Sequence, residues 1–418
     1  MEKFDVAVIG AGAAGLIAAS RAAELGAKVL LIEKMKTTGR KLAITGKGRC
    51  NITNIAPISE FIKHVYPNGR FLKAAFANFY NDDIVSLLNK NGVETVNERG
   101  GRVFPKSNNA NDIVKALTDN AIKQGVEIRN NCKLEQIKIE NSTIQGIVYS
   151  NNNKQKTIIC KSVILCTGGL SYPATGSTGD GHKIAKTSGH KIVDTRPALV
   201  PLETVEKIDK KLIGLNLRNI NAVVWSNGKK TAEKFGELTF IEQGLSGPVI
   251  LTLSRTVVDE LIAKNNIEIS VDLKPALNEQ KLDARLQRDI NEYGKEELRN
   301  LFKKWMPSQL IDFTLNRLQL DGDKLANQLT GKERKKIRVF LKDLRFKISG
   351  YRPYKEAIIT AGGVSTKDIN QKTMESKIIN NLFFAGELID LDAETGGYNL
   401  QIAFSTGWLA GSNCIKIL

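Results

Sequence analysis

A short apolar segment near the N-terminus runs straight into a glycine-rich turn, and this junction constrains the fold more than any other feature. The segment DVAVIG is followed by AGAAG, so Gly10, Gly12 and Gly15 have the spacing Gly-x-Gly-x-x-Gly. The first glycine allows a tight strand-to-helix turn, the second lets a pyrophosphate approach the backbone, and the third lets the helix pack on the sheet. The helix, with Ala13 and Ala14 in its first turn, would offer free N–H groups to the anion. The pattern predicts a β-α-β unit that binds a dinucleotide.

A second strand, AKVLLIE, supports this prediction because it ends on an acid, Glu33. A carboxylate at this place in a dinucleotide-binding unit accepts hydrogen bonds from ribose hydroxyls. A purely structural glycine turn is the alternative, but the apolar strand, the alanine-rich helix and the correctly spaced acid favour binding. These features alone leave NAD and FAD open as the dinucleotide.

The next segment, GRKLAITGKGRCNITN, is dense in glycine, lysine, arginine and asparagine. It follows the second strand and is expected to lie along the cofactor. Its Cys50 has two interpretations. A cationic neighbour such as Arg49 could lower the pKa of the thiol. A small packing residue is the favoured interpretation, because no second cysteine lies nearby in the sequence.

Composition excludes several classes of protein. The chain has 418 residues, which favours two or three domains, and 42% hydrophobic residues, which is ordinary for a globular protein. No apolar run is long enough to span a membrane, and no signal peptide is expected before the first strand, so a cytoplasmic location is predicted. The five cysteines are scattered and only three histidines occur, so neither a disulfide framework nor a metal site is expected.

The net charge of +17 raises the question of an anionic partner. The segment GKERKKIRVFLKDLRFK, residues 331–347, is strongly basic and could bind nucleic acid or an anionic surface. A solvated helix face in a lysine-rich chain is the favoured interpretation, since no RNA-binding motif accompanies the charge. Nucleic acid is therefore an unlikely partner on this reading, and a small-molecule substrate is expected.

Hydrophobic patterning divides the chain into three regions. Residues 1–195 and 346–418 are expected to form the dinucleotide-binding domain, with a continuously apolar strand at 162–166 buried in a parallel sheet. Residues 196–276, including GELTFIEQGLSGPVILTL, are expected to form short strands, with Asn227-Gly228 as a hairpin turn. Residues 277–345 have helical periodicity, with a capping box at Thr330 and Glu333. A last helix is expected from about Asn399.

Five segments together resemble the bacterial flavoproteins of the YhiN or aminoacetone-oxidase-like family. They are GAGAAG with Glu33, GRKLAITGKGRCNITN, CTGGLSYPATGSTGDGH, GELTFIEQGLSGP and FFAGELIDLDAETGGYNLQIAFSTG. The resemblance spans most of the chain and implies noncovalently bound FAD. It also implies an α/β fold, namely a glutathione-reductase-type FAD-binding Rossmann-like domain with an inserted β-barrel-like domain and a small helical subdomain.

The resemblance also implies which residues hold the cofactor. The pyrophosphate, ribose and adenosine would contact Gly10, Gly12, Ala13, Ala14, Gly15, Glu33, Lys34 and Leu134. The remaining cofactor contacts would come from Arg40, Lys41, Gly46, Asn51, Thr167, Gly168, Gly169, Gly386, Glu387, Asn399, Leu400 and Gln401. The last three open a helix whose N-terminus would stabilise the negative charge of a reduced flavin.

The chain departs from the family at one place. The family usually has Phe-Thr-His before GLSGP, whereas this chain has Phe240-Ile241-Glu242. The departure removes the most obvious general base, and the catalytic residues remain unassigned.

The predicted function is an FAD-dependent oxidoreductase that transfers hydride between the flavin and a small organic substrate or NAD(P)H. A small amine and NAD(P)H both stay open as the hydride donor, and O2 or an organic molecule as the acceptor. The alternative function is a tRNA- or nucleic-acid-binding flavoprotein that uses the basic helical segment as its platform.

Overall fold

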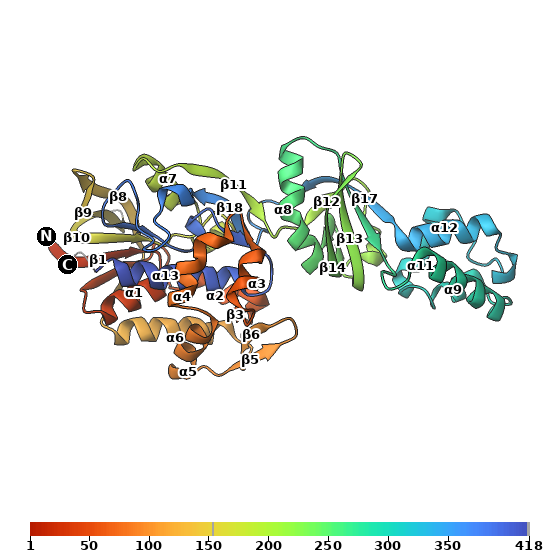
Figure 1. Ribbon diagram of the computed structural model, residues 1–418, viewed down its shortest axis with the longest axis horizontal. Coiled ribbons are helices and arrows are strands. Elements are labelled where there is room, and N and C mark those ends of the chain that lie inside the picture. Colours follow the sequence, from red (N-terminus) through yellow and green to blue (C-terminus); the bar gives the residue numbers. More distant parts are fainter. Residues whose placement is uncertain (153, 416–418) are drawn as a thin grey trace. The chain divides into compact units, whose positions relative to one another are not determined.

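The computed structural model (Figure 1) describes residues 1–152 and 154–415 and divides the chain into two compact units. Unit 1 comprises Met1–Pro197 and Tyr354–Leu418, and unit 2 comprises Ala198–Pro353. The sequence placed these divisions at 195/196 and 345/346, and it treated the helical insert as a region of its own. The second division falls later because a strand at 344–351 belongs to the barrel of unit 2.

Unit 1 contains both strands and helices. Its strands are β1 (Glu2–Ile9), β2 (Val29–Ile32), β3 (Thr53–Asn54), β4 (Val65–Tyr66), β5 (Thr95–Glu98), β6 (Arg102–Pro105), β7 (Glu127–Arg129), β8 (Cys132–Glu140), β9 (Thr143–Asn151), β10 (Lys154–Leu165), β11 (Ile192–Ala198), β18 (Ile359–Val364), β19 (Leu382–Phe384) and β20 (Asp392–Ala393). Its helices are α1 (Ala13–Glu24), α2 (Arg40–Ile44), α3 (Ile58–Phe61), α4 (Lys73–Asn78), α5 (Asn81–Lys90), α6 (Ala110–Lys123), α7 (Asp180–Thr187) and α13 (Tyr398–Asn413).

The main sheet of unit 1 has the order β7-β2-β1-β10-β9-β8, with β19 also paired to β10. Strands β7, β2, β1, β10 and β19 are parallel, whereas β9 and β8 form an antiparallel extension. The predicted strand at 162–166 overlaps only the last part of β10, which ends at Leu165 and whose first half pairs with β9. Parallel strands end at the same edge of a sheet, so β1, β2, β10 and β19 bring their carboxyl ends together.

Helices α1 and α13 pack unusually closely beside this sheet. A Cβ on Gly407 would lie 2.4 Å from Ala14 O, and one on Gly411 would lie 2.4 Å from Ala18 O. The same step along both helices shows that they run in the same direction. Because a helix rises about 1.5 Å per residue, Asn399 lies roughly 12 Å beyond Gly407 along the axis of α13. The first turn of α13 therefore extends past the first turn of α1.

Unit 2 combines a closed barrel with a set of helices. The barrel has the order β12-β15-β14-β13-β16-β17. Its strands are β12 (Leu202–Thr204), β13 (Asn216–Ser226), β14 (Lys229–Ile241), β15 (Gly244–Ser246), β16 (Ile267–Asp272) and β17 (Leu344–Tyr351). Its helices are α8 (Pro248–Ile262), α9 (Glu279–Glu292), α10 (Leu298–Phe302), α11 (Ser308–Leu318) and α12 (Gly331–Lys342). The hairpin turn at Asn227-Gly228 is confirmed, since it joins β13 and β14.

The strand expected in PVILTL is wrong, because this segment begins α8. Val249, Ile250, Leu253, Val257 and Val258 are all buried at helical spacing. A short β-branched run does not distinguish a strand from a buried helix, and packing against the barrel decides the outcome here. Pro248 occupies the first turn of this helix, where its missing N–H removes no hydrogen bond.

The helices α9 to α12, which lie between β16 and β17 in the chain, share one apolar core with the barrel. Leu282 and Leu286 of α9 are buried, as their spacing predicted. Trp305 is almost fully buried and donates from Nε1 to Asp289 Oδ2 at 2.9 Å. The capping box is also confirmed, because Thr330 Oγ1 accepts from Glu333 N at 3.2 Å and Glu333 Oε2 accepts from Thr330 N at 2.8 Å. The α/β fold class with an inserted barrel is confirmed.

Candidate cofactor-binding site

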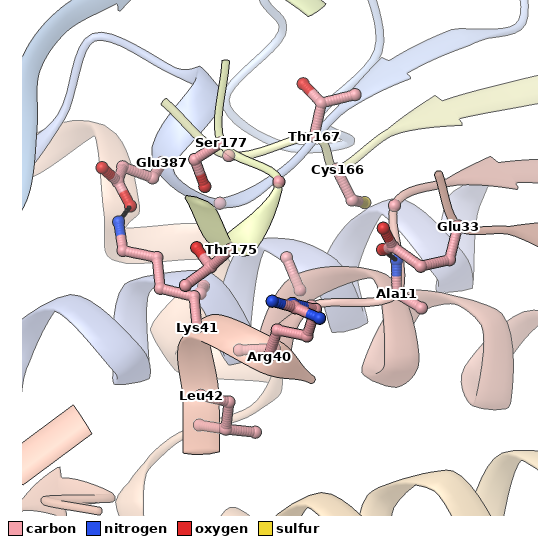
Figure 2. Close-up of a pocket in the computed structure, with 18 of the residues that line it drawn as sticks. Ala11, Glu33, Arg40, Lys41, Leu42, Cys166, Thr167, Thr175, Ser177 and Glu387 are labelled. Atoms are coloured by element: carbon pink, nitrogen blue, oxygen red, sulfur yellow. Dashed lines mark hydrogen bonds and ion pairs between the residues drawn. The ribbon is translucent and has the colours of Figure 1, made fainter. Parts of the chain in front are cut away.

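A deep pocket lies at the carboxyl edge of the parallel sheet in unit 1 (Figure 2). It encloses about 1420 Å³ of empty space, its open mouth included. Three of its lining residues directly follow parallel strands, namely Gly10 after β1, Glu33 after β2 and Cys166 after β10. A fourth, Gly386, lies two residues after the end of β19. The pocket therefore lies where open α/β sheets bind their ligands.

The glycine-rich turn forms one wall of the pocket. Gly10 has φ +98°, and a Cβ there would lie 2.6 Å from Cys166 O, so no other residue fits this turn. Gly12 is different, because a Cβ there would meet nothing within 4 Å. No side chain caps the N-terminus of α1. The turn thus presents open space and free N–H groups, which suit a pyrophosphate.

Glu33 braces the same turn from β2. Its Oε2 accepts from Ala11 N at 2.9 Å, and its Oε1 accepts from Met35 N at 2.8 Å. Each carboxylate oxygen keeps a second lone pair, so both can still accept from hydroxyls in the pocket. Figure 2 shows this carboxylate facing the backbone of Ala11.

A charged pair stands beside Glu33 at the same end of the pocket. Lys34 Nζ lies 2.7 Å from Asp180 Oδ2, in the first turn of α7. Burial alone would raise the pKa of Asp180, but the hydrogen bond and charge of Lys34 hold that pKa below its usual value. The pair joins α7 to the loop after β2 and closes this end of the pocket.

A second ion pair lies at the other end of the pocket. Lys41 Nζ is 2.5 Å from Glu387 Oε2 and 2.6 Å from Ser171 Oγ. Glu387 Oε1 also accepts from Ser171 Oγ at 2.8 Å and from Thr360 N at 2.9 Å. These contacts satisfy the carboxylate, whereas the ammonium group has three donors and uses two of them here. Lys41 therefore retains one N–H for a ligand in the pocket.

The N-terminus of α13 also borders the pocket. Asn399 and Leu400 line the pocket there. The Asn399 side chain donates to Ala393 O at 2.8 Å and accepts from Ala393 N at 2.9 Å, which fixes the turn before the helix. A helix N-terminus at this place favours negative charge in the adjacent pocket.

Most of the residues expected to hold the cofactor line this pocket. These are Gly10, Gly12, Ala13, Ala14, Glu33, Lys34, Arg40, Lys41, Leu134, Thr167, Gly168, Gly386, Glu387, Asn399 and Leu400. Their direct contact with the cofactor stays a prediction. The pocket also contains residues that sequence reasoning missed, namely Thr37, Cys132, Lys133, Thr175, Gly176, Ser177, Asp180, Ile358, Ile359 and Leu391. The segment TGSTGD at 175–180 belongs to one of the family motifs, but nothing in its sequence indicated that it borders this pocket.

Five expected residues do not line the pocket but support it from behind. A Cβ on Gly15 would lie 1.8 Å from Gly10 O, and one on Gly169 would lie 2.4 Å from Thr360 Oγ1. Gln401 is fully buried and accepts from Thr53 Oγ1 at 2.6 Å.

The other two are Gly46 and Asn51, and Asn51 holds the turn before α13. Gly46 packs against Asn51 N. With its amide oriented to satisfy both partners, Asn51 accepts from Gly397 N at 3.0 Å. Glu242, at the position of the family histidine, is exposed in the turn between β14 and β15 in unit 2.

Cys50 is a packing residue, not a reactive thiol. Its side chain is fully buried, and burial raises the pKa of the thiol to about 12 despite a hydrogen bond with Thr45. Arg49 points elsewhere, donating from Nε to Asn108 Oδ1 at 2.7 Å and stacking over Phe104. The favoured sequence interpretation is therefore correct.

The Cys50 thiol makes stability sensitive to alkaline pH. The unfolded thiol ionises near pH 9.0 and the folded one near 12, so its contribution is complete below pH 9 and is lost as the pH rises towards 12. Between pH 8 and 10 this group should remove about 1.4 kcal/mol from the free energy of unfolding. Urea unfolding of the wild type and of Cys50→Ala measures this, and the variant should show the shallower pH dependence. Equal slopes for the two proteins would contradict the assignment.

The residues present fit FAD. The uncapped α1 N-terminus with the open Gly12 suits the pyrophosphate, and Glu33 suits a ribose. Thr167 Oγ1 is buried beside the pocket and has no hydrogen-bond partner among the described residues. That hydroxyl faces Gly181 of α7, where an added Cβ would lie 2.0 Å from it, so the fit to FAD rests on the turn and on Glu33. Both ion pairs, Lys34–Asp180 and Lys41–Glu387, line this one pocket and could contact different parts of a dinucleotide.

Comparison with known proteins identifies the family. The chain matches the family model described as "HI0933-like protein Rossmann domain" over residues 4–413. The chain belongs to this family. The resemblance drawn from the sequence motifs is confirmed, and the protein is an FAD-dependent oxidoreductase.

Three relatives match this chain over nearly their whole length. A ribosomal RNA dihydrouridine synthase of Escherichia coli is 32% identical over 416 residues, which cover 99% of both chains. Its namesake from Haemophilus influenzae is 30% identical and covers 96% of both chains. A 3-dehydro-bile acid delta(4,6)-reductase of Clostridium scindens is 27% identical and covers 97% of this chain and 98% of the relative.

Solved structures agree on the fold. A 3-ketosteroid delta1-dehydrogenase from Sterolibacterium denitrificans superposes with a TM-score of 0.54 at 15% identity and covers 100% of both chains. A 3-ketosteroid-delta4-(5alpha)-dehydrogenase from Rhodococcus jostii has a TM-score of 0.50 at 16% identity, covering 99% of this chain and 97% of its own. Across the described residues, none of the helices combines the length and apolar character needed to cross a bilayer.

Proposed function

We propose that this flavoprotein reduces a carbon–carbon double bond conjugated to a carbonyl, and that its substrate is uridine in ribosomal RNA. The observation that carries this proposal is the similarity to the Escherichia coli ribosomal RNA dihydrouridine synthase over 99% of both chains. Conversion of uridine to dihydrouridine adds two hydrogen atoms across C5 and C6, next to the C4 carbonyl. The bile acid reductase relative bears a name that describes the same kind of bond reduction.

The pocket residues support a reduction of this kind. Reduced FAD, when bound, supplies a hydride, and uracil needs that hydride at C6 and a proton at C5. Electrons would come from NAD(P)H or another reductant. Lys41, anchored by Glu387 and Ser171, keeps one N–H available to a ligand, and the N-terminus of α13 favours negative charge on that ligand. These groups would orient the cofactor and stabilise its charged form.

This proposal departs from two expectations drawn from the sequence alone. Oxidation of a small amine was one candidate reaction, whereas the names of all three full-length relatives describe addition of hydrogen. Nucleic acid was considered an unlikely partner on charge alone. The net charge of +17 is compatible with an RNA substrate, and the name of the Escherichia coli relative supports RNA as a partner.

Nucleoside mass spectrometry tests the proposal. The FAD-loaded protein is incubated with NADPH or dithionite and with ribosomal RNA transcribed in vitro, which carries no modification. Dihydrouridine should appear at one site in digests of the treated RNA and be absent with the flavin-free Gly12→Asp variant. Absence of dihydrouridine from both naked transcripts and assembled ribosomal particles would refute the proposal.

A steroid enone is the second candidate substrate, supported by the full-length similarity to the bile acid reductase. The same reduced protein can be mixed anaerobically with a 3-oxo-4,6-diene steroid. Rapid reoxidation of the flavin by the steroid, with none by RNA, would favour this second candidate over the first.

A further inference from the structure

We propose that one exposed face of α12 in unit 2 binds the phosphate backbone of the RNA substrate. This face consists of Lys332, Lys335 and Lys336 and is called the lysine face below. The inference rests on the proposed function for the identity of its ligand, but it assigns a separate binding surface to residues outside the cofactor pocket.

The spacing of the three lysines places them together. Positions 332, 335 and 336 fall on one side of a helix, where side chains three and four residues apart are about 5–6 Å from each other. All three are exposed, whereas Ile337, Phe340 and Leu341 on the opposite side are buried in the core of unit 2. The helix is thus held by its apolar side and displays the lysines to solvent.

Ion pairing separates these lysines from four other basic residues of segment 331–347. Arg334 and Arg338 lie 3.3 Å and 3.4 Å from Asp283 of α9. Lys342 pairs with Asp272. Arg345 lies 2.9 Å from Glu268. These four side chains are therefore largely neutralised, and Arg334, Arg338 and Lys342 hold α12 in place.

No acid in the described part of the chain pairs with Lys332, Lys335 or Lys336. The acid nearest in sequence, Glu333, is turned to Lys324 Nζ at 2.9 Å and to the capping residue Thr330. The positive charge of the lysine face therefore remains available to an external anion.

The chemistry of the face favours RNA over a lipid surface. Helices that lie on membranes carry a broad apolar stripe beside their basic residues. Only Val339, at 48% exposure, adds an apolar side chain to the lysine face. Three clustered ammonium groups with little apolar surface match a run of phosphates, which they neutralise while displacing counterions.

The test compares two triple variants of the FAD-loaded full-length protein. K332Q/K335Q/K336Q removes the lysine face, and K90Q/K123Q/K138Q removes the same charge from exposed positions of unit 1. Binding to fluorescent ribosomal RNA transcripts is measured between 50 and 200 mM salt, concentrations that bracket the physiological range. The visible flavin spectrum and the thermal unfolding midpoint report whether each variant is intact.

The lysine-face variant should bind RNA about tenfold or more weakly, and its slope of log Kd against log salt should fall by about 2 to 3. The control variant should lose much less on both counts. Equal losses in the two variants, unchanged RNA binding, or a selective loss of binding to anionic phospholipid vesicles or to an acidic protein would overturn the inference.

The dihydrouridine assay distinguishes failure of the lysine face from failure of the proposed function. One outcome is that the wild type forms dihydrouridine while the lysine-face variant keeps its affinity for RNA and its salt slope. In that case the lysine face does not bind the RNA, and the proposed function stands. If the wild type forms no dihydrouridine, the proposed function is refuted, whatever the RNA-binding data show.

Discussion

Gly12→Asp should yield a folded protein that no longer binds FAD. A side chain at this position meets no neighbour within 4 Å, and the backbone angles of Gly12, φ −85° and ψ −165°, suit any residue. An aspartate here would cap the N-terminus of α1 and so would not destabilise the helix. Its charge would stand where the pyrophosphate is expected, and repulsion of about 2 to 4 kcal/mol would weaken binding roughly 30- to 1000-fold.

The measurement is the flavin content of the purified variant, followed by titration of the apoprotein with FAD. Gly12→Ala is the matched control, because it adds a Cβ without charge and should retain most of the affinity. Thermal unfolding of the apoproteins should give midpoints equal within error for the variant and the wild type. A Gly12→Asp protein that retains bound FAD would show that the pyrophosphate does not lie at this turn.

Gly407→Leu should unfold unit 1 or strip it of FAD, because α1 and α13 cannot separate without moving the pocket. The added Cβ would lie 2.4 Å from Ala14 O, a backbone atom that cannot rotate away. Overpacking of this kind costs about 3 kcal/mol or more. Any relief by displacement of α13 would also move Asn399 and Leu400, which line the pocket.

Urea unfolding and FAD affinity together measure this effect. Gly331→Ala serves as the control glycine substitution, since a Cβ there meets nothing within 4 Å and its φ is not positive. That change should stabilise the protein by about 0.4–1 kcal/mol. A Gly407→Leu protein with wild-type stability and wild-type FAD affinity would contradict the close packing of the two helices.

The local motifs were readable from the sequence because each depends on neighbouring residues. The Gly10-to-Glu33 unit, the Asn227-Gly228 turn and the capping box at Thr330 each combine residue types that satisfy backbone geometry on their own. The helix α8 could not be predicted from the sequence, because a short run of β-branched residues fits a strand equally well. Packing against the barrel decides between the two.

The domain boundary after the helical segment also could not be predicted from the sequence. The chain from Phe346 has the alternation of a strand, and the sequence assigned it to the cofactor domain. Its pairing with β12 and β16 instead closes the barrel of unit 2. Strand pairing over long sequence separations leaves no local signal, since the partner is chosen by the shape of the whole barrel.

By itself, the sequence determined the dinucleotide-binding unit and, through its family motifs, the FAD cofactor, because the Gly10 turn needs its glycines wherever the rest of the chain goes. Only the tertiary structure decided which residues behind that turn reach the pocket. It placed Lys41 between Glu387 and Ser171, residues far apart in the chain, and it set Asn51 and Gln401 behind the pocket wall. The tertiary structure also separated the paired arginines of α12 from its free lysines, because ion pairing depends on which helix packs alongside.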